Sequence, residues 1–127
     1  MTVFDTNIII DFLNGEKAAE DIVKNTTDNR GVKLTMVSCY ELLSGASKSQ
    51  EERLGAFLDS IIIYPLDMNS ARIASEFYRE SRKRGNELGI ADILILATAK
   101  ANDEIFVTQD RAFEGMYGKV IVISRKR

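Results

Sequence analysis

Three short segments of this chain are apolar without interruption, and they restrict its possible folds more than any other feature. They are Val3-Phe4, Ile105-Phe106-Val107 and residues 120–123. A strand with one face in water alternates apolar and polar residues, whereas a strand of a parallel sheet is buried on both faces and is apolar throughout. The sequence therefore favours a mostly parallel sheet with helices on both sides.

Segments with helical periodicity alternate with the extended ones along the whole chain. We expect strands at residues 2–5, 33–37, 61–66, 104–108 and 119–123. We expect helices at residues 7–13, 16–27, 38–46, 49–60, 67–84 and 89–102, and a helical turn at 111–116. With 127 residues, the chain has the size of one domain. The predicted fold is a single α/β domain over residues 1–127, a three-layer α/β/α sandwich with a roughly five-stranded, mostly parallel sheet.

The composition excludes several classes of protein. There is no histidine and only one cysteine, Cys39, which removes Ser-His-Asp and Cys-His catalysis, zinc clusters and an internal disulfide. The apolar runs, such as residues 8–10, 61–63 and 93–97, are far shorter than the roughly 20 residues of a membrane span. The first residues lack the basic segment of a signal peptide. We expect a soluble, cytoplasmic protein with no membrane partner.

Two acidic residues follow predicted strands. Asp5 ends the first strand, and Asp110 comes two residues after the strand that ends at Thr108. In open parallel sheets, ligands bind outside the carboxyl ends of the strands. An aspartate in such a place can also cap the next helix or form a turn. Position alone leaves both interpretations open for Asp5, for Asp110 and for Thr108.

Asp92 is the acidic residue that most needs a cation. On a helix, Ile95, Leu96 and Ala99 lie three, four and seven positions after it, so they share its face. A lone carboxylate on a buried face costs several kcal/mol unless a cation or hydrogen-bond donors meet it. The favourable field of a helix N-terminus recovers only about 0.3–1 kcal/mol of that cost.

Glu41 is ambiguous from periodicity. It follows Ser38 by three residues, the spacing of a capping box. It also lies opposite the apolar residues Cys39 and Leu42 on the predicted helix, which favours a solvent-exposed glutamate. If Asp5, Asp92 and Asp110 meet at the sheet edge, an all-oxygen site without histidine or cysteine selects Mg²⁺ or Mn²⁺ over zinc.

Four short motifs, taken in their order along the chain, resemble those of PIN domains, and more closely those of VapC-type toxin ribonucleases. The resemblance spans essentially the whole chain. The motifs are Val3-Phe4-Asp5-Thr6-Asn7, Ser38-Cys39-Tyr40-Glu41-Leu42, the segment from Gly89 through Asp92 to Ala97, and the segment from Val107 through Asp110 to Phe113.

The resemblance implies a metal-dependent endoribonuclease, the toxin of a toxin–antitoxin pair. It implies that Asp5, Glu41, Asp92 and Asp110 are the catalytic carboxylates, with Asp5, Asp92 and Asp110 as ligands of Mg²⁺ or Mn²⁺. Thr6, Asn7 and Thr108 are then supporting residues. This places Glu41 in the site against its periodicity. The implied partners are an RNA substrate, a cognate antitoxin protein and a second copy of the chain in a homodimer.

The surface for RNA is less defined by the sequence. Arg72, Arg79 and Lys83 form one stripe of the predicted helix at residues 67–84 and are RNA-binding candidates, although such a stripe is also ordinary for a solvated helix face. Two other functions stay open. One is a PIN-like module that binds RNA or protein without cutting. The other is a haloacid-dehalogenase-like phosphatase, which requires Asp-x-Asp where this chain has Asp5 and Asn7.

Overall fold

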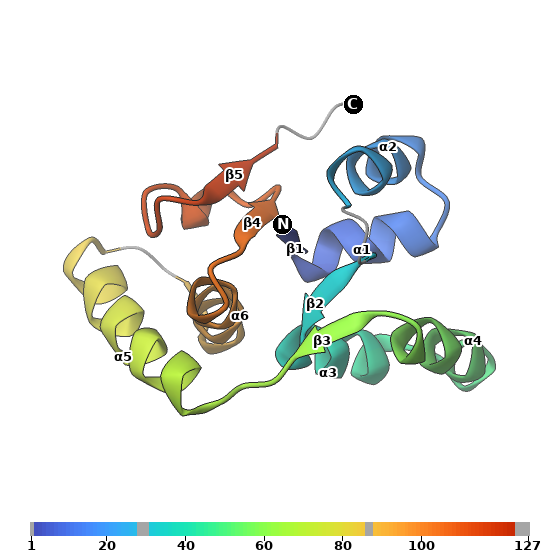
Figure 1. The fold of residues 1–127 in the computed structure, drawn as a ribbon, viewed down its shortest axis with the longest axis horizontal. Coiled ribbons are helices and arrows are strands. Elements are labelled where there is room, and N and C mark those ends of the chain that lie inside the picture. Colours follow the sequence, from blue (N-terminus) through green and yellow to red (C-terminus); the bar gives the residue numbers. More distant parts are fainter. Residues whose placement is uncertain (1, 28–30, 86–87, 124–127) are drawn as a thin grey trace.

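The computed structural model describes residues 2–27, 31–85 and 88–123. Strands and helices alternate along them, as the sequence predicts (Figure 1). The strands are β1 (Thr2–Phe4), β2 (Lys33–Thr35), β3 (Ile62–Tyr64), β4 (Ile105–Thr108) and β5 (Val120–Val122). The helices are α1 (Thr6–Leu13), α2 (Lys17–Thr26), α3 (Met36–Gly45), α4 (Lys48–Asp59), α5 (Met68–Lys83), α6 (Ile90–Ala101) and the 3₁₀ turn η1 (Arg111–Phe113).

The strand pairing is parallel, but the strands form two hydrogen-bonded ladders. One ladder has the order β1-β4-β5 and the other pairs β2 with β3. The expectation of one five-stranded sheet is therefore wrong in this respect, although β1 and β2 are neighbours. The number of apolar segments predicts how many strands form. It does not predict whether the backbone groups of two neighbouring three-residue strands are aligned for a ladder.

Strands β1 and β4 are buried on both faces, as their uninterrupted apolar segments predict, whereas the third such segment forms the edge strand β5, where Ile121 is 48% exposed and the prediction is wrong. Val3 and Phe106 belong to a core cluster with Phe77 of α5 and Leu96 of α6. Their chain neighbours Phe4 and Val107 belong to a second cluster, on the opposite face, with residues of α1 to α4. Helices α5 and α6 thus cover one face and α1 to α4 cover the other, in three layers (Figure 1).

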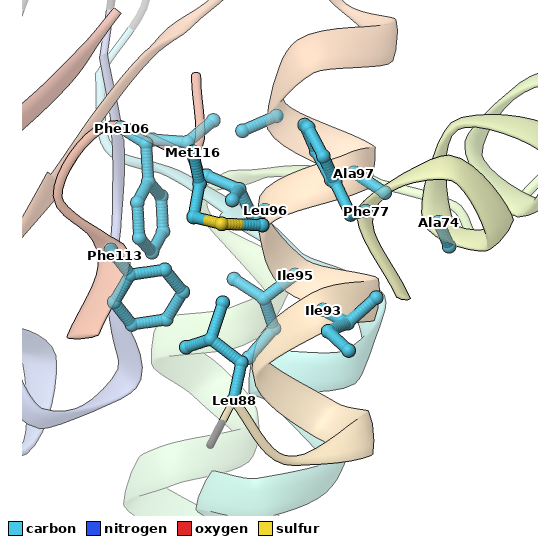
Figure 2. Packing of buried hydrophobic residues seen from close by; sticks show 12 residues of the cluster. Ala74, Phe77, Leu88, Ile93, Ile95, Leu96, Ala97, Phe106, Phe113 and Met116 are labelled. Carbon is cyan, nitrogen blue, oxygen red and sulfur yellow. The ribbon is translucent and has the colours of Figure 1, made fainter. Parts of the chain in front are cut away.

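Helix α6 forms the centre of the first cluster. Ile95, Leu96, Ala97 and Ala99 have no exposed surface. In Figure 2, Ile95 and Leu96 lie toward Phe113 and Met116, while the α5 residues of the cluster approach α6 from the other side. Because α6 is buried along most of its length, the position of its first turn, which carries Asp92, is fixed by the core.

Helix α3 begins earlier than the sequence predicts. Strand β2 ends at Thr35, and the Thr35 side chain, not that of Ser38, caps the helix by accepting a hydrogen bond from the Ser38 backbone N–H. The expected capping box of Ser38 and Glu41 is therefore wrong. Ser38 is a buried residue inside the first turn. Its spacing from Glu41 is that of a capping box, but the residue that caps the helix, Thr35, lies three positions earlier.

A buried ion pair lies between the two ladders. Lys33 of β2 and Glu104, which directly precedes β4, have side chains about 1% exposed, and Lys33 Nζ lies 3.4 Å from Glu104 Oε2. The Tyr64 hydroxyl also donates to Glu104 Oε2. This pair connects β2 and β3 to the β1-β4-β5 ladder. In the part of the chain that the structure describes, no helix has the length and apolar character needed to cross a membrane.

Candidate active site

Asp5 occupies the carboxyl end of β1 and is both a helix cap and a buried acid. Its Oδ1 accepts from the Thr6 backbone N–H at 2.8 Å and its Oδ2 from the Thr108 hydroxyl at 2.7 Å. Burial raises the pKa of Asp5, these two hydrogen bonds oppose that rise, and the nearby carboxylates Glu41 and Asp110 add to it. Asp5 can therefore cap α1 and still offer lone pairs to a ligand at the sheet edge, because capping uses only one lone pair of Oδ1.

Thr108 connects two of the acidic residues. Its side chain is fully buried at the end of β4. Its hydroxyl donates to Asp5 and accepts from the Asp110 backbone N–H at 3.0 Å. Asp110 itself is exposed and caps η1, with Oδ1 accepting from Ala112 N at 2.9 Å. Thr108 thus fixes Asp5 directly and the backbone of Asp110 at the same time.

Glu41 faces this edge of the sheet from α3. It is half-buried, and its Oε1 accepts from the Thr6 hydroxyl at 2.7 Å. Thr6 belongs to α1, 35 residues earlier in the chain. The periodicity of α3 indicated a solvated glutamate. The structure differs because α1 packs against α3 and brings a buried hydroxyl to the polar side of that helix.

Asp92 has the most perturbed carboxyl group of the site. Burial is the largest cause and, with repulsion from Asp5, Asp110 and Glu41, raises its pKa to about 6, against a lowering by a hydrogen bond from the Gly89 backbone. Its side chain is half-buried in the first turn of α6. Because the other three carboxylates raise the pKa of Asp92, the four groups lie near enough to interact electrostatically, although they come from four different parts of the fold.

The residues present fit a hard divalent cation. Within residues 2–27, 31–85 and 88–123, no three or more Asp, Glu, Cys or His side chains lie close enough together to hold a metal ion, so the carboxylates form no closed set of ligands. A closed set is not required for Mg²⁺, which usually keeps several water molecules and binds the protein through one or two carboxylates. The donors here are carboxylate and hydroxyl oxygens, which hard cations prefer. Burial, with repulsion from the neighbouring carboxylates, raises the pKa values of Asp5 and Asp92.

The other residues singled out from the sequence lie elsewhere. Asn7 is exposed on the first turn of α1. Arg72, Arg79 and Lys83 are exposed on α5, and α6 lies between α5 and the strands β1 and β4 (Figure 1). Among the described contacts, none connects Asn7 or these three basic side chains to the four carboxylates.

Ser38 and Thr35 also belong to the site, although the sequence analysis did not assign them to it. Both are fully buried, and Ser38 Oγ lies 2.9 Å from Thr6 Oγ1 and 3.3 Å from Thr35 Oγ1. The sequence feature that could have indicated Ser38 is its spacing from Glu41, because residues three apart on a helix share a face.

Comparison with known proteins connects this geometry to one family. The family model described as "PIN domain" matches residues 2–119 of this chain. Ribonuclease VapC19 of Mycobacterium tuberculosis is 30% identical over 115 residues, which is 89% of this chain and 92% of that protein. Ribonuclease VapC10 of the same organism is 29% identical over 103 residues, which is 81% of this chain and 77% of that protein.

Solved structures show the same fold. The chain matches one chain of a toxin–antitoxin complex from Klebsiella pneumoniae with a TM-score of 0.83 and 25% sequence identity. The match covers 96% of this chain and 97% of that one. The carboxylate cluster described above thus lies on a scaffold that recurs with little change in length.

Proposed function

The chain belongs to the PIN domain family, and we propose that it is a divalent-metal-dependent endoribonuclease, the toxin of a toxin–antitoxin pair. The observation that supports the proposal is that Asp5, which follows β1 of a parallel ladder, and Glu41, Asp92 and Asp110 lie near enough to one another to raise the pKa values of Asp5 and Asp92. The two ribonuclease relatives support the substrate class.

In the proposed mechanism Asp5, Asp92 and Asp110 would hold Mg²⁺ or Mn²⁺. When bound, such a cation lowers the pKa of a water molecule and offsets the charge that develops on a phosphodiester in the transition state. Glu41 accepts a hydrogen bond from the attacking water and orients it. Thr108 holds the Asp5 side chain and the Asp110 backbone in place by hydrogen bonds, and Thr6 keeps Glu41 turned toward these two residues. The chain has no histidine, so no imidazole serves as the general base.

The proposal is tested by incubating the purified protein with total RNA in Mg²⁺, in EDTA, and in EDTA followed by excess Mg²⁺. We expect cleavage only when Mg²⁺ is free. Asp5→Asn should remove the activity, while Asp11→Asn, a change of the same kind on α1, should not. Cleavage of equal rate in EDTA, or full activity of Asp5→Asn, would contradict the mechanism.

We propose that RNA contacts the basic stripe Arg72, Arg79 and Lys83. These side chains are exposed on α5, and phosphate contacts by such residues depend steeply on salt. Replacing all three with alanine should raise KM for RNA and flatten its salt dependence while kcat stays close to the wild-type value. An unchanged KM would remove this stripe from the RNA surface.

The proposed partners are a cognate antitoxin and a second copy of the chain. The Klebsiella neighbour is a toxin–antitoxin complex. In α1, Ile8 and Ile9 are fully buried, but Ile10 and Leu13 remain 38% and 40% exposed, so this helix has apolar surface that its own chain does not cover. We expect a homodimer in sedimentation at tens of micromolar. A monomer at that concentration would contradict the dimer.

A further inference from the structure

We infer that Ser38 is a positioning residue for Glu41 and acts on it through Thr6. Three hydroxyl groups, from Thr35, Ser38 and Thr6, form a continuous chain that ends on Glu41 Oε1. The three residues come from β2, α3 and α1, so the chain joins elements that the sequence separates by more than 30 positions. The catalytic part of this inference rests on the proposed function, whereas its geometric part does not.

Two threonine hydroxyls converge on Ser38 Oγ. Thr35 Oγ1 donates to it at 3.3 Å and itself accepts from Ser38 N at 3.1 Å. Thr6 Oγ1 donates to it at 2.9 Å and also donates to Glu41 Oε1 at 2.7 Å. A carboxylate oxygen only accepts, so the Thr6 hydroxyl lies between two acceptors, and Ser38 is the one that holds it in this orientation.

Burial makes this arrangement rigid. Thr35 and Ser38 have no exposed surface, and Thr6 is 6% exposed, so water does not replace a missing partner. Glu41 is half-buried and lies near like charges on Asp5 and Asp92, which favour side-chain conformations turned away from the cluster. The hydrogen bond from Thr6 opposes that tendency, and Ser38 fixes the Thr6 rotamer that makes it.

Ser38→Ala tests the inference, and Ser44→Ala is its matched control. Ser44 is an exposed serine of the same helix whose hydroxyl donates to the backbone oxygen of Glu41 at 3.2 Å, so it contacts the same residue outside the hydroxyl chain. Thr35→Val is unsuitable because it also removes the cap of α3. Thr6→Val breaks the chain one step nearer Glu41, and Thr6→Ser keeps it.

We expect Ser38→Ala and Thr6→Val each to lower kcat about tenfold, as the loss of an orienting hydrogen bond typically does, with KM for RNA unchanged. The double variant should be no slower than Thr6→Val alone, because both changes interrupt one path. Ser44→Ala should retain wild-type kcat, and Thr6→Ser, which keeps a hydroxyl at this position, should lose less activity than Thr6→Val. Independent, multiplicative losses in the double variant, or a wild-type kcat for Ser38→Ala in a folded protein, would overturn the inference.

Crystal structures of the metal-free Ser38→Ala and Ser44→Ala variants provide a readout without activity. In Ser38→Ala we expect Glu41 to leave Thr6 or to occupy several conformations, and in Ser44→Ala to keep the contact. An unmoved, well-ordered Glu41 in Ser38→Ala would refute positioning even if the protein cleaves RNA. A displaced Glu41 in a protein without nuclease activity would support positioning and reject the proposed function.

Discussion

The Thr108 hydroxyl donates a 2.7 Å hydrogen bond to Asp5 Oδ2 across 103 residues of sequence. It joins the last residue of β4 to the residue that follows β1, and both lie at the carboxyl end of the same parallel ladder. The same hydroxyl accepts from Asp110 N. One buried threonine therefore connects two of the four carboxylate residues of the candidate site.

Removing that hydroxyl should affect both stability and activity. Thr108→Val keeps the shape but leaves Asp5 Oδ2 and Asp110 N without their partner. Hydrogen bonds to charged groups typically contribute about 1.5–3 kcal/mol, so we expect unfolding free energy to fall by about 2 kcal/mol and RNA cleavage to fall at least about tenfold. Urea denaturation and initial rates measure the two effects.

Two threonine variants control for this change. Thr108→Ser keeps the hydroxyl and should stay close to wild type in activity. Thr98→Val removes an equally buried hydroxyl that donates only to the Leu94 backbone oxygen, so it should leave cleavage unchanged. If Thr98→Val and Thr108→Val reduced activity equally, the role assigned to the Thr108 hydroxyl would be wrong.

The buried Lys33–Glu104 pair predicts a large cost for losing one charge. Lys33→Met leaves Glu104 buried without its cation, which typically costs about 3–5 kcal/mol. The double change Lys33→Met with Glu104→Gln removes both charges and keeps an acceptor for Tyr64, so it should be less destabilised than Lys33→Met alone. Urea denaturation near neutral pH compares them.

The exposed pair of Lys119 and Asp103, 2.7 Å apart, is the control for the buried one. Surface pairs typically contribute about 0–1 kcal/mol, so Lys119→Met should cost little. A Lys33→Met variant no less stable than Lys119→Met would show that the buried pair does not hold the two ladders together.

The raised pKa of Asp92 predicts how metal-free stability varies with pH. Its folded-state pKa of about 6 lies above its ordinary value of 3.8. The folded state therefore binds this proton more tightly than the unfolded state, and stability falls as pH rises. The contribution of Asp92 is most favourable below pH 3.8 and is lost as pH rises to about 6.

Thermal melts in EDTA between pH 4 and 7 check this sign. Asp92→Asn cannot ionise, so its melting temperature relative to wild type should increase across that window. Asp59→Asn, at an exposed acid at the end of α4, should show no such trend. A constant difference between wild type and Asp92→Asn would mean that Asp92 titrates normally.

The sequence predicted the parts of this fold that depend on local pattern. The apolar segments around Val3 and Phe106 indicated strands buried on both faces, and both faces are buried. The face of Glu41 was not predictable from α3 alone, because its partner Thr6 arrives through the packing of α1 against α3. The start of α3 was misassigned because the cap, Thr35, lies at the end of a strand, where a threonine is equally ordinary.

Metal-dependent melting of wild type and Asp92→Asn at neutral pH tests the central claim, that this carboxylate cluster binds a divalent cation. In EDTA we expect Asp92→Asn to melt at a higher temperature than wild type, because one like charge is gone. Millimolar Mn²⁺ should raise the wild-type melting temperature by mass action, and should raise that of Asp92→Asn much less. Equal Mn²⁺ shifts in the two proteins would contradict the account.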